Sequence, residues 1–128
     1  MKLNIDCMRD VLLILEEAPY RTAVEFTEIC AKLVPDYTHD EICYSILKLD
    51  EAGFISAKIE RNLNSLNVNE VSDITYEGHQ FLANVRTNKV WSTTKDVMSK
   101  VGSTSVQTAS QIASTVISEL IKNTLFPI

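Results

Sequence analysis

The stretch THDEICYSILKLDEAGFISAKI, residues 38–59, changes from a helical to an extended pattern within a few residues. Thr38 followed three residues later by Glu41 has the spacing of a capping box, and Gly53 is a typical C-terminal stop. The apolar positions between them repeat at helical spacing: Ile42, Ile46 and Leu49. The pattern therefore predicts a helix over residues 38–52, packed through one face.

The residues after this helix predict a β-hairpin. Residues 54–59 contain Phe, Ala and Ile in an extended pattern, and residues 68–74 return with Val and Ile. Between them lies an asparagine-rich stretch, residues 61–67, which predicts a polar loop.

The residues before the helix predicted over 38–52 indicate two further helices and one short strand. Asn4 can cap a helix over residues 4–18, and residues 20–26 mix β-branched and aromatic types that favour a strand. Thr27 can cap a second helix, which ends before a proline. The expected order up to residue 74 is helix, strand, helix, helix and two strands.

Helical patterns dominate the remainder. Thr75 can cap a fourth helix, and residues 90–101 and 105–124 are also expected to be helical. We therefore predict an α+β, mostly α fold, a winged helix-turn-helix with a β-hairpin wing and a C-terminal helical extension. The expected domains are residues 1–89 for the winged helix and 90–128 for the extension.

Several stretches are also similar to one known family. They are residues 1–17, Tyr44 to Ile55, Ile74 to Leu82, and Val85 to Trp91. Together they resemble a bacterial and prophage-associated family called domain of unknown function 2513. The resemblance brings no established activity, and the winged-helix character of the family implies a regulator by analogy of fold.

Composition narrows the function classes. The chain has 128 residues, enough for one core, and three widely spaced glycines that cannot form a phosphate-binding loop. No apolar run approaches the roughly 18 residues of a membrane span. Three widely separated cysteines without a secretory signal predict reduced thiols in a cytoplasmic protein. We expect no membrane association and no small-molecule cofactor.

A catalytic or metal role is not expected. His39 and Cys43 lie four residues apart, with Cys30 as a third candidate, but this set is short of tetrahedral zinc ligation. Cys30 and Cys43 are therefore interpreted as small buried residues. We expect His79 to occupy an interior position beneath the wing or to bond a backbone carbonyl. The chain is predicted not to be an enzyme.

The net charge of −5 averages two unlike parts, because residues 1–80 carry −8 and residues 81–128 carry +3. The outer face of the third predicted helix holds three acids and one lysine, which opposes phosphate binding. Candidate nucleic-acid contacts for duplex DNA therefore lie on the wing and in the basic stretch: Lys58, Arg61, Asn62, Asn64, Arg86, Lys89 and Lys95. The alternative is a protein-interaction module in which Tyr44, Lys48 and the acids dock a basic partner.

The last predicted helix carries a wide apolar stripe, about half of its circumference. Such a stripe can pack on its own domain or pair with a second copy, and both remain open. We expect a homodimer, with an interface at Ile112, Val116 and Leu120, since regulators of this kind commonly read paired half-sites with two-fold symmetry.

Overall fold

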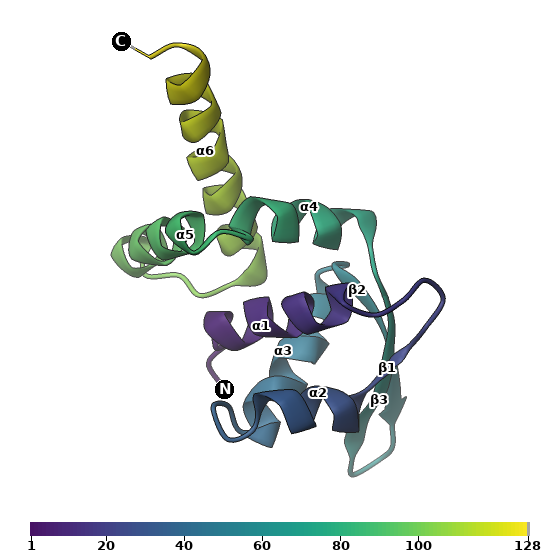
Figure 1. The fold of residues 1–128 in the computed structure, drawn as a ribbon. Helices are drawn as coiled ribbons and strands as arrows, with labels where there is room; N and C mark the ends of the chain where they lie inside the picture. The colour runs from purple at the N-terminus through teal and green to yellow at the C-terminus, as the bar shows by residue number, and fades with distance from the viewer. Residues whose placement is uncertain (128) are drawn as a thin grey trace. The chain divides into compact units, whose positions relative to one another are not determined.

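The computed structural model describes residues 1–127 and divides them into two compact units, Met1–His79 and a second from Gln80 onward. Over these residues it contains six helices and one three-stranded antiparallel sheet (Figure 1). The α+β, mostly helical class is therefore confirmed. The boundary between residues 89 and 90 stays a prediction.

Two of the three helices of the first unit begin at the predicted caps. For α1 (Ile5–Glu16), the side chain of Asn4 accepts a hydrogen bond from the backbone N–H of Cys7 at 3.1 Å. For α3 (His39–Glu51), both hydrogen bonds of the capping box between Thr38 and Glu41 are present. Each cap satisfies backbone groups that the first helical turn leaves without partners.

The prediction that Thr27 caps the second helix is wrong. This helix, α2 (Phe26–Leu33), begins one residue earlier, and its N-cap Glu25 makes no side-chain capping bond. Glu25 is also the last residue of a strand, so the sheet fixes where the helix starts.

The sheet has the order β1-β3-β2, with β1 (Val24–Glu25), β2 (Ile55–Arg61) and β3 (Leu66–Ile74). Only two residues of the strand predicted over 20–26 pair with a neighbour. The hairpin strands are longer than predicted, because Arg61 and Leu66 still face each other across the ladder.

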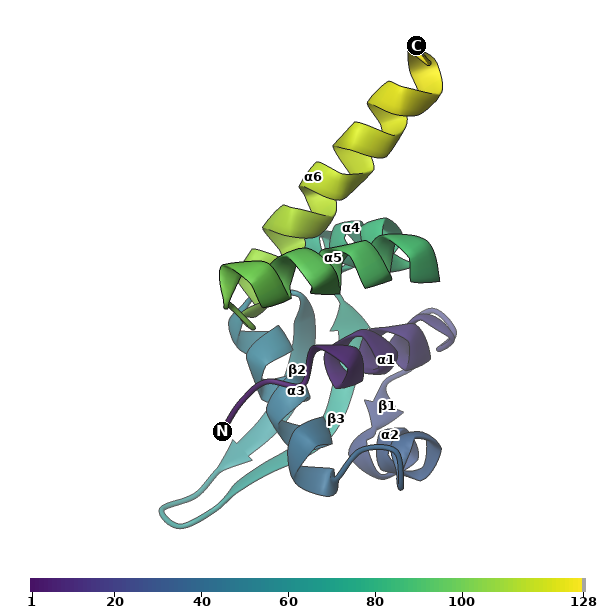
Figure 2. The same cartoon turned by 90° about the vertical axis from the view of Figure 1, so that its left-hand side faces the viewer.

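One apolar core holds the first unit together. The three helices lie on the same face of the sheet (Figures 1 and 2). The side chains between these layers are almost fully buried: Met8, Val11, Leu12, Ile29, Ile42, Ile46, Leu49, Val68 and Val71. The predicted inward face of α3 is therefore confirmed.

The remaining helices follow short capped turns. They are α4 (Tyr76–Val85), which continues into the second unit, α5 (Asn88–Val101) and α6 (Val106–Leu125). Thr75 caps α4 by accepting from the backbone N–H of Gly78 at 3.2 Å, as predicted. Thr87 caps α5, so that helix begins before residue 90, and Ser105 caps α6. Gly102 ends α5 at a φ of +80°, a left-handed conformation that suits glycine.

Candidate nucleic-acid interface

The outer face of α3 offers no isolated positive charge. Lys48 is the only lysine or arginine of this helix, and its Nζ lies 2.9 Å from Oε2 of Glu51 and 5.1 Å from the centre of the Tyr44 ring. The hydrogen bond to Glu51 raises the pKa of Lys48. Because its charge is already shared with a carboxylate, Lys48 adds little to phosphate attraction.

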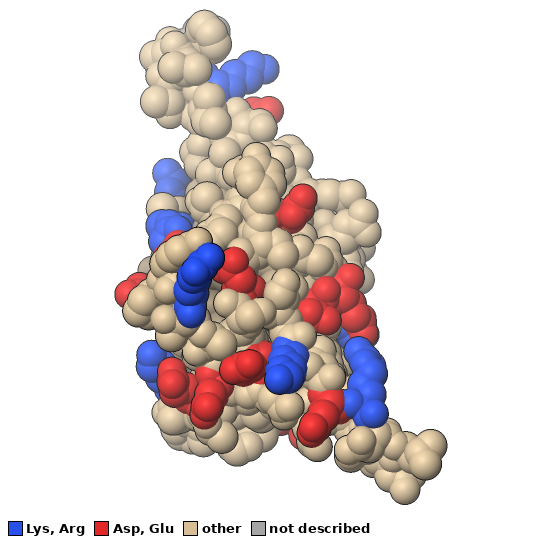
Figure 3. All heavy atoms as spheres, turned by 90° about the vertical axis from the view of Figure 1, so that its right-hand side faces the viewer, with Lys and Arg blue, Asp and Glu red and all other residues tan. Residues whose placement is uncertain are grey.

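Four of the predicted nucleic-acid residues lie together on the β2–β3 hairpin. Lys58 and Arg61 are exposed on β2, and Asn62 and Asn64 are exposed in the turn. Figure 3 shows the end of this hairpin as an uncharged projection, with both basic and acidic side chains behind it. The structure therefore gathers these four residues on one narrow element.

The acidic residues of the hairpin lie in its strands and not in the turn that joins them. Lys58 pairs in the ladder with Glu70, and Glu60 pairs with Asn67. Arg61 is adjacent to Glu60 in the strand, so their side chains point to opposite faces of the sheet. The face that carries Arg61 therefore lacks the neighbouring carboxylate.

The end of the hairpin is closed by backbone bonds between two residues. The N–H of Asn62 donates to the carbonyl of Ser65 at 2.8 Å, and the N–H of Ser65 donates back at 3.4 Å. Between them Leu63 is fully exposed, at 103% relative accessibility. The asparagines of this turn are among the predicted contacts, whereas Leu63 is not, because its exposure depends on where the strands end.

The base of the hairpin is fastened to the end of α3. The carboxylate of Asp50 accepts from the backbone N–H of Ala57 at 3.0 Å, beside an irregularity in the strand register. The hydroxyl of Thr75 donates to the carbonyl of Gly53. These bonds hold the root of the hairpin against a helix whose inner face is buried.

The second basic group belongs to the other compact unit. Arg86 lies between α4 and α5 and is exposed, as is Lys89 in the first turn of α5. Lys95 is half-buried, with Nζ 6.0 Å from the centre of the Trp91 ring. These residues share one helix and its N-terminal connection.

Helix α6 is buried unevenly along its length. Val106, Ala109 and Ala113 are buried where α6 packs against α5. The three predicted dimer residues are half-buried: Ile112, Val116 and Leu120. Beyond them the exposed apolar side chains are Ile121, Leu125 and Phe126, none of which is among the predicted interface residues.

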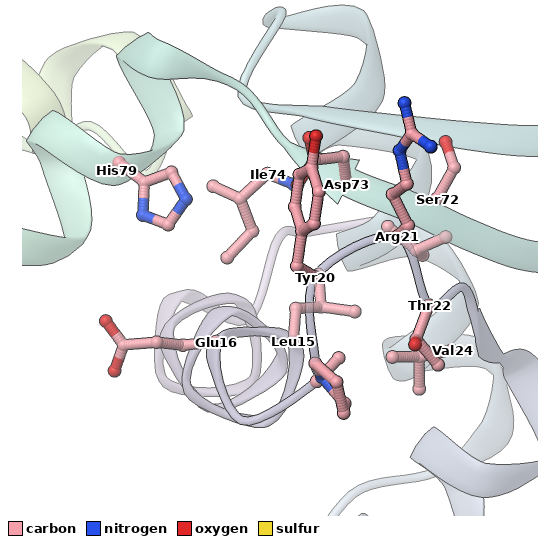
Figure 4. A pocket seen from close by; sticks show the side chains of 13 residues that line it. Leu15, Glu16, Tyr20, Arg21, Thr22, Val24, Ser72, Asp73, Ile74 and His79 are labelled. Atoms are coloured by element: carbon pink, nitrogen blue, oxygen red, sulfur yellow. The ribbon is translucent and has the colours of Figure 1, made fainter.

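A polar hollow of about 400 Å³ lies in the first unit, beside β3 (Figure 4). Its lining includes Glu16, Arg21, Asp73 and His79. The expectation of an interior His79 is wrong, because its side chain is exposed and Gly78 takes the buried place. Arg21 adopts a φ of +62°, which is uncommon for a residue with a side chain, and its guanidinium lies 5.5 Å from the Tyr20 ring centre. The hollow thus combines two acids with two basic groups.

The cysteines are free thiols of unequal exposure. Cys7 and Cys30 are buried, whereas Cys43 is only half-buried, so its predicted burial is partial. Burial raises the pKa of the Cys7 thiol to about 11. A thiol with this pKa has almost no nucleophilic thiolate near neutrality. Within residues 1–127 no group of three or more His, Cys, Asp or Glu side chains is arranged to hold a metal ion.

The comparison with known families decides where the chain belongs. A family model described as "Hypothetical protein (DUF2513)" matches residues 2–105. The chain belongs to this family. An uncharacterised protein of Haemophilus influenzae is 29% identical over 126 residues, which cover 94% of this chain and 99% of that protein.

No solved structure matches this member of the family significantly. The match to the family model covers the sheet and the first five helices, and it ends just before α6 begins. Among the helices of residues 1–127, none is both long enough and apolar enough to span a bilayer.

Proposed function

We propose that the chain is a winged-helix protein that binds duplex DNA through its β2–β3 hairpin. The order α1-β1-α2-α3-β2-β3 and the sheet order β1-β3-β2 support the winged-helix interpretation. In this interpretation α2 and α3 form the helix-turn-helix and the hairpin is the wing. The protein acts by binding, without catalysis, as a cytoplasmic regulator of bacterial or prophage origin.

The observation that carries the proposal is the concentration of exposed polar and basic side chains at the hairpin. Arg61 can contact phosphate, and the amides of Asn62 and Asn64 can contact phosphate or base edges. Lys48 on α3 is bound to Glu51 and Tyr44, so the hairpin carries the interaction in place of the helix. Arg86, Lys89 and Lys95 are a second phosphate-binding group on the same chain.

A second candidate function uses α3 itself. Lys48, the one lysine or arginine of α3, is paired with Glu51, and Asp40 is exposed in the first turn of the helix. A basic protein segment would complement this face and contact Tyr44. The two functions differ in which face of the first unit is occupied.

Self-association through α6 completes the proposal. Ile112, Val116 and Leu120 are half-buried apolar positions, and Ile121 and Leu125 are exposed apolar positions at the end of the same helix. A second copy of the same helix would cover part of this apolar surface. A two-fold dimer would also present two hairpins to one duplex.

Fluorescence anisotropy of a labelled mixed-sequence duplex tests the DNA proposal. We expect binding at low salt that weakens as salt is added, because neutralised phosphates release counterions. The absence of binding at low salt would reject it and favour the α3 docking face. Binding retained by Lys48→Ala and weakened by Arg61→Ala would support a contact at the hairpin.

A further inference from the structure

The fully exposed leucine at the end of the hairpin has no structural role within the first unit. Leu63 is 103% accessible, whereas Leu66, three residues on, is 37% accessible. Covering this side chain with a partner would remove its apolar surface from water, which is favourable. The turn itself is fixed by the two backbone bonds between Asn62 and Ser65.

The neighbours of this leucine limit what the partner can be. Arg61 donates hydrogen bonds only, and Asn62 and Asn64 carry both donors and acceptors. The six residues from Asn62 to Asn67 contain no carboxylate. A protein core or a lipid surface would leave these amides without partners. A groove lined with hydrogen-bond acceptors and bordered by phosphates would satisfy the N–H donors of Arg61 and of the two amides, while the amide oxygens can bond water.

The minor groove of A·T-rich DNA has this chemistry. Its base edges present acceptors only, whereas a G·C pair adds an amino donor. At about 6 Å the groove is too narrow for a two-stranded ribbon but admits single side chains, so the side chains at the end of the turn can enter it. Apolar side chains inserted from this groove separate neighbouring base pairs and kink the duplex.

We propose that Leu63 is a wedge that enters the minor groove and unstacks one base step, while Arg61 and the flanking asparagines bind the groove beside it. The proposal rests on the DNA-binding function proposed above and adds the groove, the base preference and the deformation. Unstacking costs least at a TA step, so the preferred site contains one. The hydrogen bonds of Asp50 and Thr75 at the base of the hairpin hold it in position while the leucine separates the base pairs.

The test uses an A·T-rich duplex with 2-aminopurine in place of the adenine of a central TA step, because this base fluoresces more strongly when it is unstacked. With the full-length protein we expect the fluorescence to rise severalfold on binding. Leu63→Ala should remove the rise and weaken binding about tenfold, with an unchanged salt slope because no phosphate contact is lost. Leu63→Met should keep the rise, since an unbranched apolar side chain can still insert.

Leu66→Ala is the matched control on the same hairpin, and it should leave the fluorescence rise in place. Binding without any rise, or a rise that Leu63→Ala retains, would overturn the wedge and leave DNA binding intact. A failure of all duplexes to bind, measured by anisotropy on the same samples, would overturn the wedge together with the proposed function.

Discussion

The side-chain amide of Asn4 donates a hydrogen bond of 2.7 Å to Oε2 of Glu41, and so joins the N-cap of α1 to the first turn of α3. The other oxygen of the same carboxylate accepts from the backbone N–H of Thr38 at 3.0 Å. These bonds, first that from Asn4, hold the pKa of Glu41 below its ordinary value of 4.5. One carboxylate thus caps its own helix and ties it to another.

This arrangement predicts how stability depends on pH. Since the pKa of Glu41 is lower in the folded than in the unfolded chain, its contribution is complete above pH 4.5 and is lost as the pH falls through the folded value. Glu41→Gln should therefore lower the free energy of unfolding at pH 7 and have a smaller effect near the acid limit of folding. Urea denaturation measures both values.

Glu60→Gln is the control, because Glu60 is exposed on the hairpin and has no part in this junction. An equal loss of stability in Glu41→Gln at both pH values would contradict the linkage.

The second prediction concerns two glycines with opposite requirements. A Cβ atom on Gly78 would collide with the carbonyl oxygen of Phe54 and would lie 2.7 Å from Cγ2 of Ile74. Gly53 has open space but a φ of +79°. Gly78→Ala should cost more than about 2 kcal/mol, because backbone must move. Gly53→Ala should cost about 1 kcal/mol for the left-handed conformation. Urea titration of both variants measures these losses of unfolding free energy. A smaller loss in Gly78→Ala than in Gly53→Ala would show that the close approach at Gly78 is relieved at little cost.

The sequence predicted the elements whose signals are local. The capping box at Thr38, the apolar face of α3 and the stop at Gly53 depend on residues within a few turns, and the structure contains all three. The predicted length of β1 was too great, because the strand extends only as far as it pairs with β3 at Val71, which lies far along the chain. The start of α2 was misplaced for the same reason.

The candidate site was predicted less completely than the fold. Charge and amide side chains pointed to Arg61, Asn62 and Asn64, whose exposure could be expected from a polar loop. The exposure of Leu63 could not, because it depends on how far the ladder extends and which residues are left in the turn. The buried place of Gly78 and the exposure of His79 depend on the approach of Phe54, which no local pattern records.

The third prediction separates the basic residues by their contribution to DNA binding. Arg61→Ala and Lys89→Ala should each weaken binding and reduce the slope of log affinity against log salt by about 1. Lys48→Ala should leave the slope unchanged, because that ammonium is bound to Glu51. Anisotropy over a salt series provides the slopes. An unchanged slope in both Arg61→Ala and Lys89→Ala would exclude these residues from the phosphate contacts.

The fourth prediction concerns thiol reactivity. Cys43 is half-buried, whereas Cys7 and Cys30 are buried, and burial raises the pKa of all three thiols. In the folded protein Cys43 should react first with a disulfide reagent, and Cys7 should react only when the unit opens. Mass spectrometry after short labelling identifies the order, and Cys43→Ser removes the fast phase. Fast labelling of Cys7 in that variant would show that α1 does not remain packed against α3.

The last prediction divides α6 into a half that stabilises its own unit and a half that binds a second copy. Ala113 has no accessible surface, so Ala113→Asp places a charge in the packed interface with α5 and should unfold this unit. Ile121 is 53% exposed, so Ile121→Asp should leave the helical circular dichroism nearly unchanged. If α6 pairs with its copy, light scattering should give the molar mass of a dimer for the wild type and of a monomer for Ile121→Asp. Lys122→Gln, next to it on the exposed end of the helix, also lowers the net charge by one; it is the matched charge control and should remain dimeric. A wild-type chain that stays monomeric at high concentration would show that the apolar end of α6 does not bind a second copy.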